Sequence, residues 1–141
     1  MTADEIIAAL GLERHPEGGW FRETWRAEAA RGQRPSGTMI YFLLAAGERS
    51  HWHRVDAAEH WLWHAGAPLS LRISETAAGP AALHRLGPEL PSGQLPQILV
   101  PPHHWQSAET AGDWTLVSCA VSPGFDFAGF ELAAPGFDIP G

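Results

Sequence analysis

The sequence has few of the features that place a protein outside the cell or across a membrane. Cys119 is the only cysteine, which excludes an intramolecular disulfide and fits a reducing cytoplasm. No apolar run reaches the roughly 18 residues of a membrane-spanning helix. Asp4 and Glu5 stand where a secretion signal would carry positive charge. A cytoplasmic location is therefore expected.

Positive charge is also scarce. The chain has 9 Lys and Arg against 16 Asp and Glu, which gives a formal net charge of −7 and a pI of about 5.5. This balance argues against nucleic acid or an anionic membrane surface as a partner. The chain has no G-x-S-x-G, P-loop or G-x-G-x-x-G motif, and nothing in it indicates a Ser/His/Asp triad.

Glycine, proline and tryptophan are abundant by contrast. The 15 glycines and 12 prolines interrupt the chain often, as many short strands require. The 7 tryptophans are expected to line a core, a cavity or a subunit contact, because large aromatic side chains seldom stay exposed.

The pattern of apolar residues predicts one helix followed by strands. Thr2 and Glu5 form a capping box that begins a helix within residues 1–12, and Gly11 ends it. Residues 27–37 read as a loop, and residues 133–141 as a loosely ordered tail. Residues 1–141 are thus expected to form a single all-β domain, a sandwich or barrel. The predicted strands are 20–25, 38–45, 50–53, 59–64, 68–74, 82–86, 97–100, 105–108, 113–122 and 125–132.

Residues 47–66 contain the best candidate for a metal site. Side chains alternate along a strand, so His51 and His53 should share a face, and Glu59 should return to it on the next strand. Gln106, in a second segment after Pro101, could complete the set with its amide oxygen. Two histidines with a carboxylate suit a divalent metal such as Zn, Fe, Ni or Mn. The alternative is that the histidines are hydrogen-bonded cavity residues without a metal.

Several other residues are expected near the same cavity. Trp61 and Trp63 lie two and four residues after Glu59, so they should face the same side of the strand and form the cavity wall. His60 and His64 should face outward. His104 shares the parity of Gln106 and is a further candidate for the wall. Three assignments remain weaker. Tyr41 is either an acid or base at the cavity or a core tyrosine, and Cys119 is expected to be a buried inert thiol. Glu23 and Asp126 are candidates for the cavity lining, although they and Glu17 are expected to be solvated or structural.

The stretch 47–66 resembles the first motif of the cupin superfamily, G-x5-H-x-H-x3,4-E-x6-G, although Glu59 comes one residue late. The second cupin motif is matched only loosely, with Gln106 where the motif has histidine. The chain is more closely similar to the small cupin-5 family, domain of unknown function 985. Segments that match this family occur in order through nearly the whole chain, at residues 16–19, 23–24, 40–44, 53–55, 59–61, 86–97, 100–106 and 116–127.

The resemblance implies a double-stranded β-helix (jelly-roll) barrel, a homodimer, a cavity near the motif histidine and a likeness to sugar-nucleotide epimerases. This chain has Ala58 and Leu62 where the family tends to have Asp and His. Leu62 puts a shared catalytic network in doubt, whereas His51 strengthens the expectation of a metal.

Three functions stay open from the sequence. The first is a cupin that binds a small polar metabolite at a divalent metal held by His51, His53, Glu59 and Gln106. The second is a metal-independent sugar or sugar-acid epimerase or isomerase, with His53 as base and Tyr41 as acid. The third is a non-catalytic module that binds a sugar or nucleotide on its tryptophans. All three take a small-molecule ligand, and whether the chain is an enzyme stays open.

Overall fold

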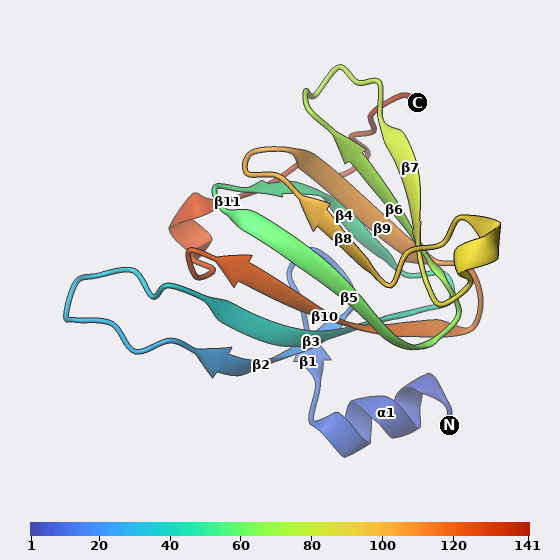
Figure 1. Cartoon of the computed structure of the whole chain (residues 1–141), viewed down its shortest axis with the longest axis horizontal. Helices are drawn as coiled ribbons and strands as arrows, with labels where there is room; N and C mark the ends of the chain where they lie inside the picture. The colour runs from blue at the N-terminus through green and yellow to red at the C-terminus, as the bar shows by residue number, and fades with distance from the viewer.

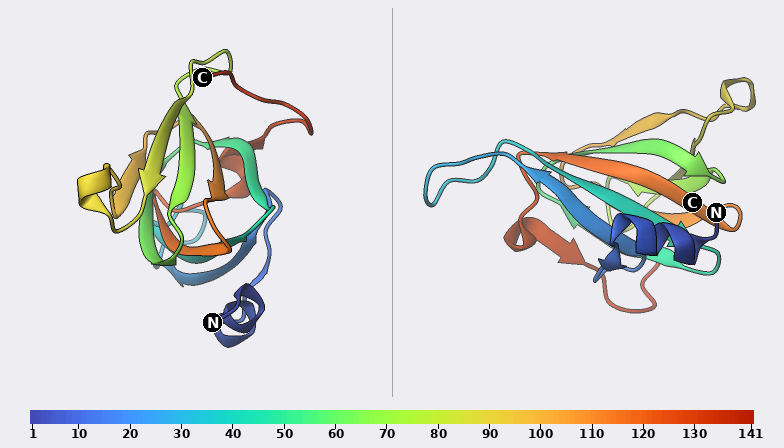
Figure 2. Two further views of the ribbon diagram at one scale, coloured as in Figure 1. Left: turned by 90° about the vertical axis from the view of Figure 1, so that its right-hand side faces the viewer. Right: turned by 90° about the horizontal axis from the view of Figure 1, so that it is seen from below.

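The computed structural model describes residues 1–141 as two antiparallel sheets that close into a barrel (Figure 1; Figure 2, left). The first sheet has the order β1-β2-β3-β10-β5-β8 and the second β11-β4-β9-β6-β7. The predicted all-β class with one short helix is confirmed. The strands are β1 (Glu13–Arg14), β2 (Trp20–Arg26), β3 (Thr38–Ala45), β4 (Arg49–Val55), β5 (Ala58–Gly66), β6 (Leu69–Ser74), β7 (Ala82–Leu86), β8 (Gln97–Val100), β9 (Trp105–Thr110), β10 (Trp114–Ser122) and β11 (Phe130–Leu132).

The helix α1 (Ala3–Leu10) is capped as its sequence predicts. The Thr2 hydroxyl accepts a hydrogen bond from the Glu5 N–H, and the Glu5 carboxylate accepts one from the Thr2 N–H. Gly11 ends the helix in the left-handed conformation. The helix lies outside the barrel below β3 (Figure 1), and Ile6 packs on the outward side chain of Leu43. The helix thereby covers the outer face of β3 around Leu43.

The apolar core fills the space between the sheets. Phe42, Trp61 and Val117 of the first sheet pack against Leu71 and Ala108 of the second, and all are almost fully buried. The core does not extend along the whole barrel. Toward the end where η2 (Phe127–Gly129) lies, polar side chains replace it, and a cavity opens there.

Two β-bulges change which side chains face the interior. In β4 the pairing with β9 shifts between Ser50 and His53, so both residues point inward although they are three apart. In β2 the pairing with β3 shifts between Glu23 and Trp25, which likewise turns Glu23 and Arg26 to the same side. A bulge adds one residue and so inverts the alternation beyond it.

The predicted strand 125–132 is only partly correct. Residues Phe127–Gly129 form the 3-10 helix η2, which Asp126 caps, and only Phe130–Leu132 pair with β4. A second short 3-10 helix, η1 (Leu90–Ser92), lies in the loop before β8. The two-residue strand β1 was not anticipated, because two residues carry no periodicity.

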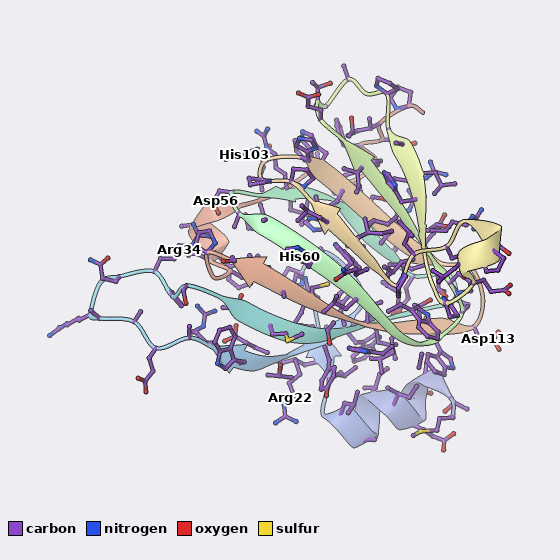
Figure 3. The ribbon with its side chains drawn as sticks, viewed as in Figure 1. Arg22, Arg34, Asp56, His60, His103 and Asp113 are labelled. Carbon is purple, nitrogen blue, oxygen red and sulfur yellow. The ribbon has the colours of Figure 1, made fainter.

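The loop 27–37 and the C-terminal tail are both anchored. Arg34 makes a two-pronged ion pair with Asp56 at 2.7 and 2.9 Å, which ties the loop to the β4–β5 turn (Figure 3). The tail was expected to be loosely ordered, but it contacts the barrel at two points. The Trp52 indole donates to Asp138 at 2.8 Å, and Ile139 is buried. The chain contains no helix of the length and hydropathy needed to cross a membrane.

Candidate functional site

A cavity of about 70 Å³ opens between the sheets at the end of the barrel that carries η2. Its size suits several waters or a small organic molecule, since one water needs roughly 10–15 Å³. The lining has two parts. The polar floor consists of His15, Glu17, His53, Glu59 and Cys119, whereas the walls and mouth consist of Phe21, Glu23, Arg26, Thr38, Ile40, Val55, Val121, Phe125 and Phe127.

Glu17 reaches the floor because the turn before β2 packs tightly on the sheets. Gly18 has φ of +107°, and a β-carbon there would lie 2.1 Å from the Arg49 carbonyl oxygen. Gly19 has φ of +83°, and its β-carbon would lie 2.8 Å from the Phe42 ring. Only glycine tolerates both the backbone conformation and the close approach. The two glycines therefore let the turn enter the barrel and place the Glu17 carboxyl inside.

Glu17 and His53 share a proton. The His53 Nδ1 lies 2.7 Å from the His51 carbonyl oxygen, which can only accept, so Nδ1 carries a hydrogen. The other ring nitrogen, Nε2, lies 3.1 Å from Glu17 Oε2. A neutral ring and an ionised carboxylate would both be acceptors at that contact, so one proton must lie between them. Burial raises the pKa of Glu17 to about 8 and lowers the pKa of His53, which favours the proton on Glu17.

His15 and Ser50 complete the surroundings of Glu17. The Ser50 hydroxyl donates to Glu17 Oε1 at 2.9 Å. The His15 Nδ1 accepts the Glu17 backbone N–H at 3.1 Å, so it carries no proton in the neutral ring. Burial, and then the nearby His53, lower the pKa of His15 to about 4. His15 is therefore neutral at pH 7.

Glu59, unlike Glu17, accepts a hydrogen bond from a donor whose orientation is fixed. Gln106 donates from Nε2 to Glu59 Oε1 at 2.8 Å, and its Oε1 accepts from the Trp61 indole at 2.8 Å. Because the indole N–H can only donate, the orientation of the amide is determined. The Cys119 thiol lines the cavity floor beside Glu59, and burial raises the pKa of that thiol. Burial raises the pKa of Glu59 to about 7, against the opposing effect of these partners and of His53.

An ion pair and aromatic rings form the mouth. Arg26 donates to both oxygens of Glu23 at 2.8 Å, and to the Phe125 carbonyl oxygen at 3.3 Å. The rings of Phe125 and Phe127 meet edge to face at 4.9 Å, and that of Phe130 packs on both. Phe127 is 58% exposed, so the mouth carries an apolar ring on its outer side.

The four predicted metal ligands do not meet at one point. The β4 bulge turns His51 away from His53, and its Nε2 lies 2.9 Å from the Ala134 carbonyl oxygen, outside the cavity. The expectation of a shared face is therefore wrong. The oxygen of Gln106 is held by Trp61, and its Nε2 hydrogens face Glu59. His53 and Glu59 do line the cavity. The structure contains no group of three or more His, Cys, Asp and Glu arranged to hold a metal, so these donors do not fit the predicted centre.

The other predicted site residues lie around the cavity rather than in it. Trp61 is in the core and supports Gln106, and Trp63 packs on that core with its indole donating to the Ala67 carbonyl at 3.2 Å. His104 is half-buried and is not part of the lining. Tyr41 is on the outer face of β3 beside His64, so it does not line the cavity, which was one of its two expected places. His60 is exposed on the outer face of β5, as predicted (Figure 3).

Sequence reasoning missed Glu17 and His15. Both lie in a turn, where no periodicity indicates which way a side chain points. The available signal was the pair Gly18-Gly19 directly after an acid, which indicates a close approach of the backbone. Glu23 was a weak candidate for the cavity and does line it.

Two solved structures are similar to this chain over nearly its whole length. A protein from Shewanella oneidensis is 41% identical, with a TM-score of 0.89 over 95% of this chain and 85% of that one. A hypothetical protein from Leishmania major is 32% identical, with a TM-score of 0.86 over 97% and 90%. No curated protein matches the sequence.

More distant matches indicate the fold alone. Oxalate decarboxylase from Bacillus subtilis is 14% identical, with a TM-score of 0.64 over 85% of this chain and 29% of that one. One description of that enzyme refers to its Mn(II) centres. The profile described as Cupin superfamily (DUF985) matches residues 4–133. The chain therefore belongs to the DUF985 family of the cupin superfamily.

Proposed function

We propose that this cupin is a metal-independent isomerase or epimerase that moves a proton on a small polar molecule. The observation that carries the proposal is the 3.1 Å contact between Glu17 Oε2 and His53 Nε2 on the floor of a small cavity, because this contact requires a proton between the two atoms. A second buried carboxyl, Glu59, lines the same cavity. Such a site offers both an acid and a base within reach of one ligand.

The partners of each group suggest its part in the reaction. Glu17 carries the proton at neutral pH, and His53 behind it can replace or accept that proton. Glu17 is thus suited to donate to a carbonyl oxygen of the ligand. Glu59 has a pKa near neutrality and is held as an acceptor by Gln106, so it is suited to remove a proton from the neighbouring carbon. The resulting enediol regains a proton at carbon from Glu59 and loses one from oxygen to Glu17. Return to the opposite face of the same carbon, with loss of the proton just added to oxygen, gives epimerisation. Return to the former carbonyl carbon, with loss of the proton of the other hydroxyl, gives isomerisation.

No step is routed through a metal, because the donors that the sequence suggested do not converge. His51 lies outside the cavity, and the amide oxygen of Gln106 is bound to Trp61. The cupin resemblance alone does not supply the missing ligands. A fold shared with metal-dependent enzymes is not evidence for the same chemistry.

Exchange of a substrate C–H for deuterium tests the proposal. Aldoses, ketoses and sugar acids are incubated with the protein in deuterium oxide and followed by proton NMR. Exchange is expected at a carbon next to a carbonyl group, unchanged by a chelator such as EDTA. Glu17→Gln should slow it by about 10²–10⁴-fold, the usual contribution of one acid–base group. Glu131→Gln is the matched control, because that carboxyl is exposed and pairs with Arg54 outside the cavity.

Loss of exchange on chelation would contradict the proposal and favour a metal-dependent reaction. Binding without exchange for the whole panel would favour a binding module instead. The cytoplasmic location stays a prediction. So does the homodimer, for which the apolar side chains Met39 and Leu116 beside Tyr41 on the outer face of the first sheet are the supporting feature.

A further inference from the structure

We infer that the ligand of this cavity is a small uncharged hydroxycarbonyl compound, and that phosphorylated, carboxylated and nucleotide-linked sugars are rejected. The inference rests on the proposed function, because it names the substrate class of the same site. Three observations carry it: the charges around the cavity, the size of the cavity and the hydrogen-bonding groups on its floor.

The cavity offers no free positive charge. The nine basic residues of the chain are all arginines, and Arg26 is the only one that lines the cavity. Its guanidinium is already committed, since it donates to both oxygens of Glu23 and to the Phe125 carbonyl. Three carboxyl groups, from Glu17, Glu23 and Glu59, line the same cavity. A phosphate or carboxylate entering it would lose its hydration and gain no cation in exchange.

The size of the cavity also favours a small ligand over a nucleotide-linked sugar. A volume of about 70 Å³ accommodates a molecule of a few non-hydrogen atoms. The mouth is formed by Phe125 and Phe127, whose rings pack edge to face at 4.9 Å. A nucleotide attached to a sugar would have to pass between these apolar rings and then remain outside without a charged partner.

The groups on the cavity floor can bind one hydrogen-bond donor and one hydrogen-bond acceptor of the ligand. Glu59 already accepts from Gln106, and its remaining lone pairs can accept a ligand hydroxyl. The proton between Glu17 and His53 can be donated to a ligand carbonyl oxygen. A hydroxyl next to a carbonyl group satisfies both contacts and needs no counter-charge, and the phenyl and aliphatic walls suit its carbon atoms.

Titration with matched pairs of three-carbon compounds tests this inference. Dihydroxyacetone and glyceraldehyde are compared with their phosphates and with glycerate, and binding is followed by chemical shift changes of Ile40 and Val121, which line the cavity. The uncharged compounds are expected to bind at least about tenfold more tightly than their charged counterparts. Equal or tighter binding of the charged compounds, or no shift with the uncharged ones, would overturn the inference.

A charge variant at the mouth makes the test specific. Glu23→Gln releases Arg26 from its ion pair and should increase the affinity for the phosphates by about tenfold, with little effect on the uncharged compounds. The matched control is again Glu131→Gln, which releases Arg54 on the outside of the barrel. If both variants change phosphate binding equally, the cavity charge does not select the ligand and the inference fails.

Deuterium exchange on the same compounds separates this inference from the proposed function. Binding of the uncharged compounds without exchange would support the ligand class and contradict the isomerase proposal. Exchange on a phosphate, with none on its uncharged counterpart, would support the isomerase proposal and contradict the ligand class. Exchange confined to the uncharged compounds is the result that both predict.

Discussion

Glu17 and Glu59 are two buried carboxyls in one cavity, with 9% and 8% exposure, yet their neighbours differ in kind. Glu17 faces a base, because the His53 Nε2 lies 3.1 Å away and has no hydrogen of its own in the neutral ring. Glu59 faces donors whose hydrogens are fixed, chiefly the Gln106 amide that Trp61 orients. Similar burial therefore gives one carboxyl that keeps its proton and one that is held as an acceptor.

The difference between the two carboxyls is the basis for the proposed division between an acid and a base. Burial raises both pKa values, to about 8 for Glu17 and about 7 for Glu59. His53 and then the Gln106 amide oppose the effect of burial on the pKa of Glu59, whereas only the Ser50 hydroxyl opposes it for Glu17, so Glu59 ionises first. Substitutions around Glu17 and around Glu59 should therefore have different effects on stability and on the pKa of each carboxyl.

The largest effect is expected where the backbone places Glu17. Gly18→Ala would put a β-carbon 2.1 Å from the Arg49 carbonyl oxygen and should lower the free energy of unfolding by about 3 kcal/mol or more. Gly32→Ala is the matched control, because Gly32 also has a positive φ, +78°, but nothing within 4 Å. It should cost only about 1–2 kcal/mol of backbone strain. Urea unfolding measures both, and equal losses would show that the close approach is unimportant.

The next largest effect is expected at Glu59, whose hydrogen-bond donor is held in a fixed orientation. Gln106→Leu removes the donor to Glu59 and leaves the Trp61 indole N–H without an acceptor. The expected loss is about 2–4 kcal/mol, since each buried unsatisfied group costs roughly 1–3 kcal/mol. Gln97→Leu, at an exposed position of β8, is the control and should change stability by less than about 0.5 kcal/mol. A small effect of Gln106→Leu would mean that Glu59 does not depend on this donor.

The pH dependence of stability tests the shared proton. The raised pKa of Glu17 contributes stability that is lost as the pH rises from 4.5 to about 8, whereas the lowered pKa of His53 contributes stability that is lost as the pH falls below 6.5. The two effects oppose each other below 6.5. Glu59, whose pKa is raised to about 7, adds a loss of the same sign up to that pH. Between pH 7 and 8 only the loss from Glu17 remains, and it amounts to about 1 kcal/mol at 1.36 kcal/mol per unit. Chemical unfolding across this range should show the fall in the natural chain and a smaller one in Glu17→Gln. The same fall in both would contradict the assignment.

The smallest effect is expected at Ser50. Ser50→Ala removes one neutral donor to Glu17 and should cost about 0.5–1.5 kcal/mol. Because that donor favours the ionised carboxyl, the pKa of Glu17 should rise further. A carboxyl titration by carbon-13 NMR checks the direction, and a lowered pKa would contradict the geometry.

The sequence predicted the fold closely because strands with alternating apolar residues and glycine-rich turns carry their own signal. Thr38–Ala45 and Ala82–Leu86 match the predicted strands at both ends, and α1 begins and ends at its predicted caps. His53 and Glu59, two of the predicted site residues, both line the cavity.

The rest depended on features without a periodic signal. A single extra residue in β4 separates His51 from His53, and alternation cannot reveal it. The bulge in β2 turns Glu23 and Arg26 to the same side in the same way. Glu17 enters the barrel through a turn, where its direction is decided by contacts with β3 and β4 rather than by its neighbours in sequence.

The most direct test of the account is the protonation state of Glu17 at neutral pH, measured by infrared spectroscopy of the carboxylic acid C=O band. The account predicts a band at pH 7 that disappears as the pH rises through about 8, is absent from Glu17→Gln and persists in Glu131→Gln. If the band assigned by Glu17→Gln is already lost at pH 6, Glu17 is ionised at neutral pH and the proposed division between acid and base is wrong.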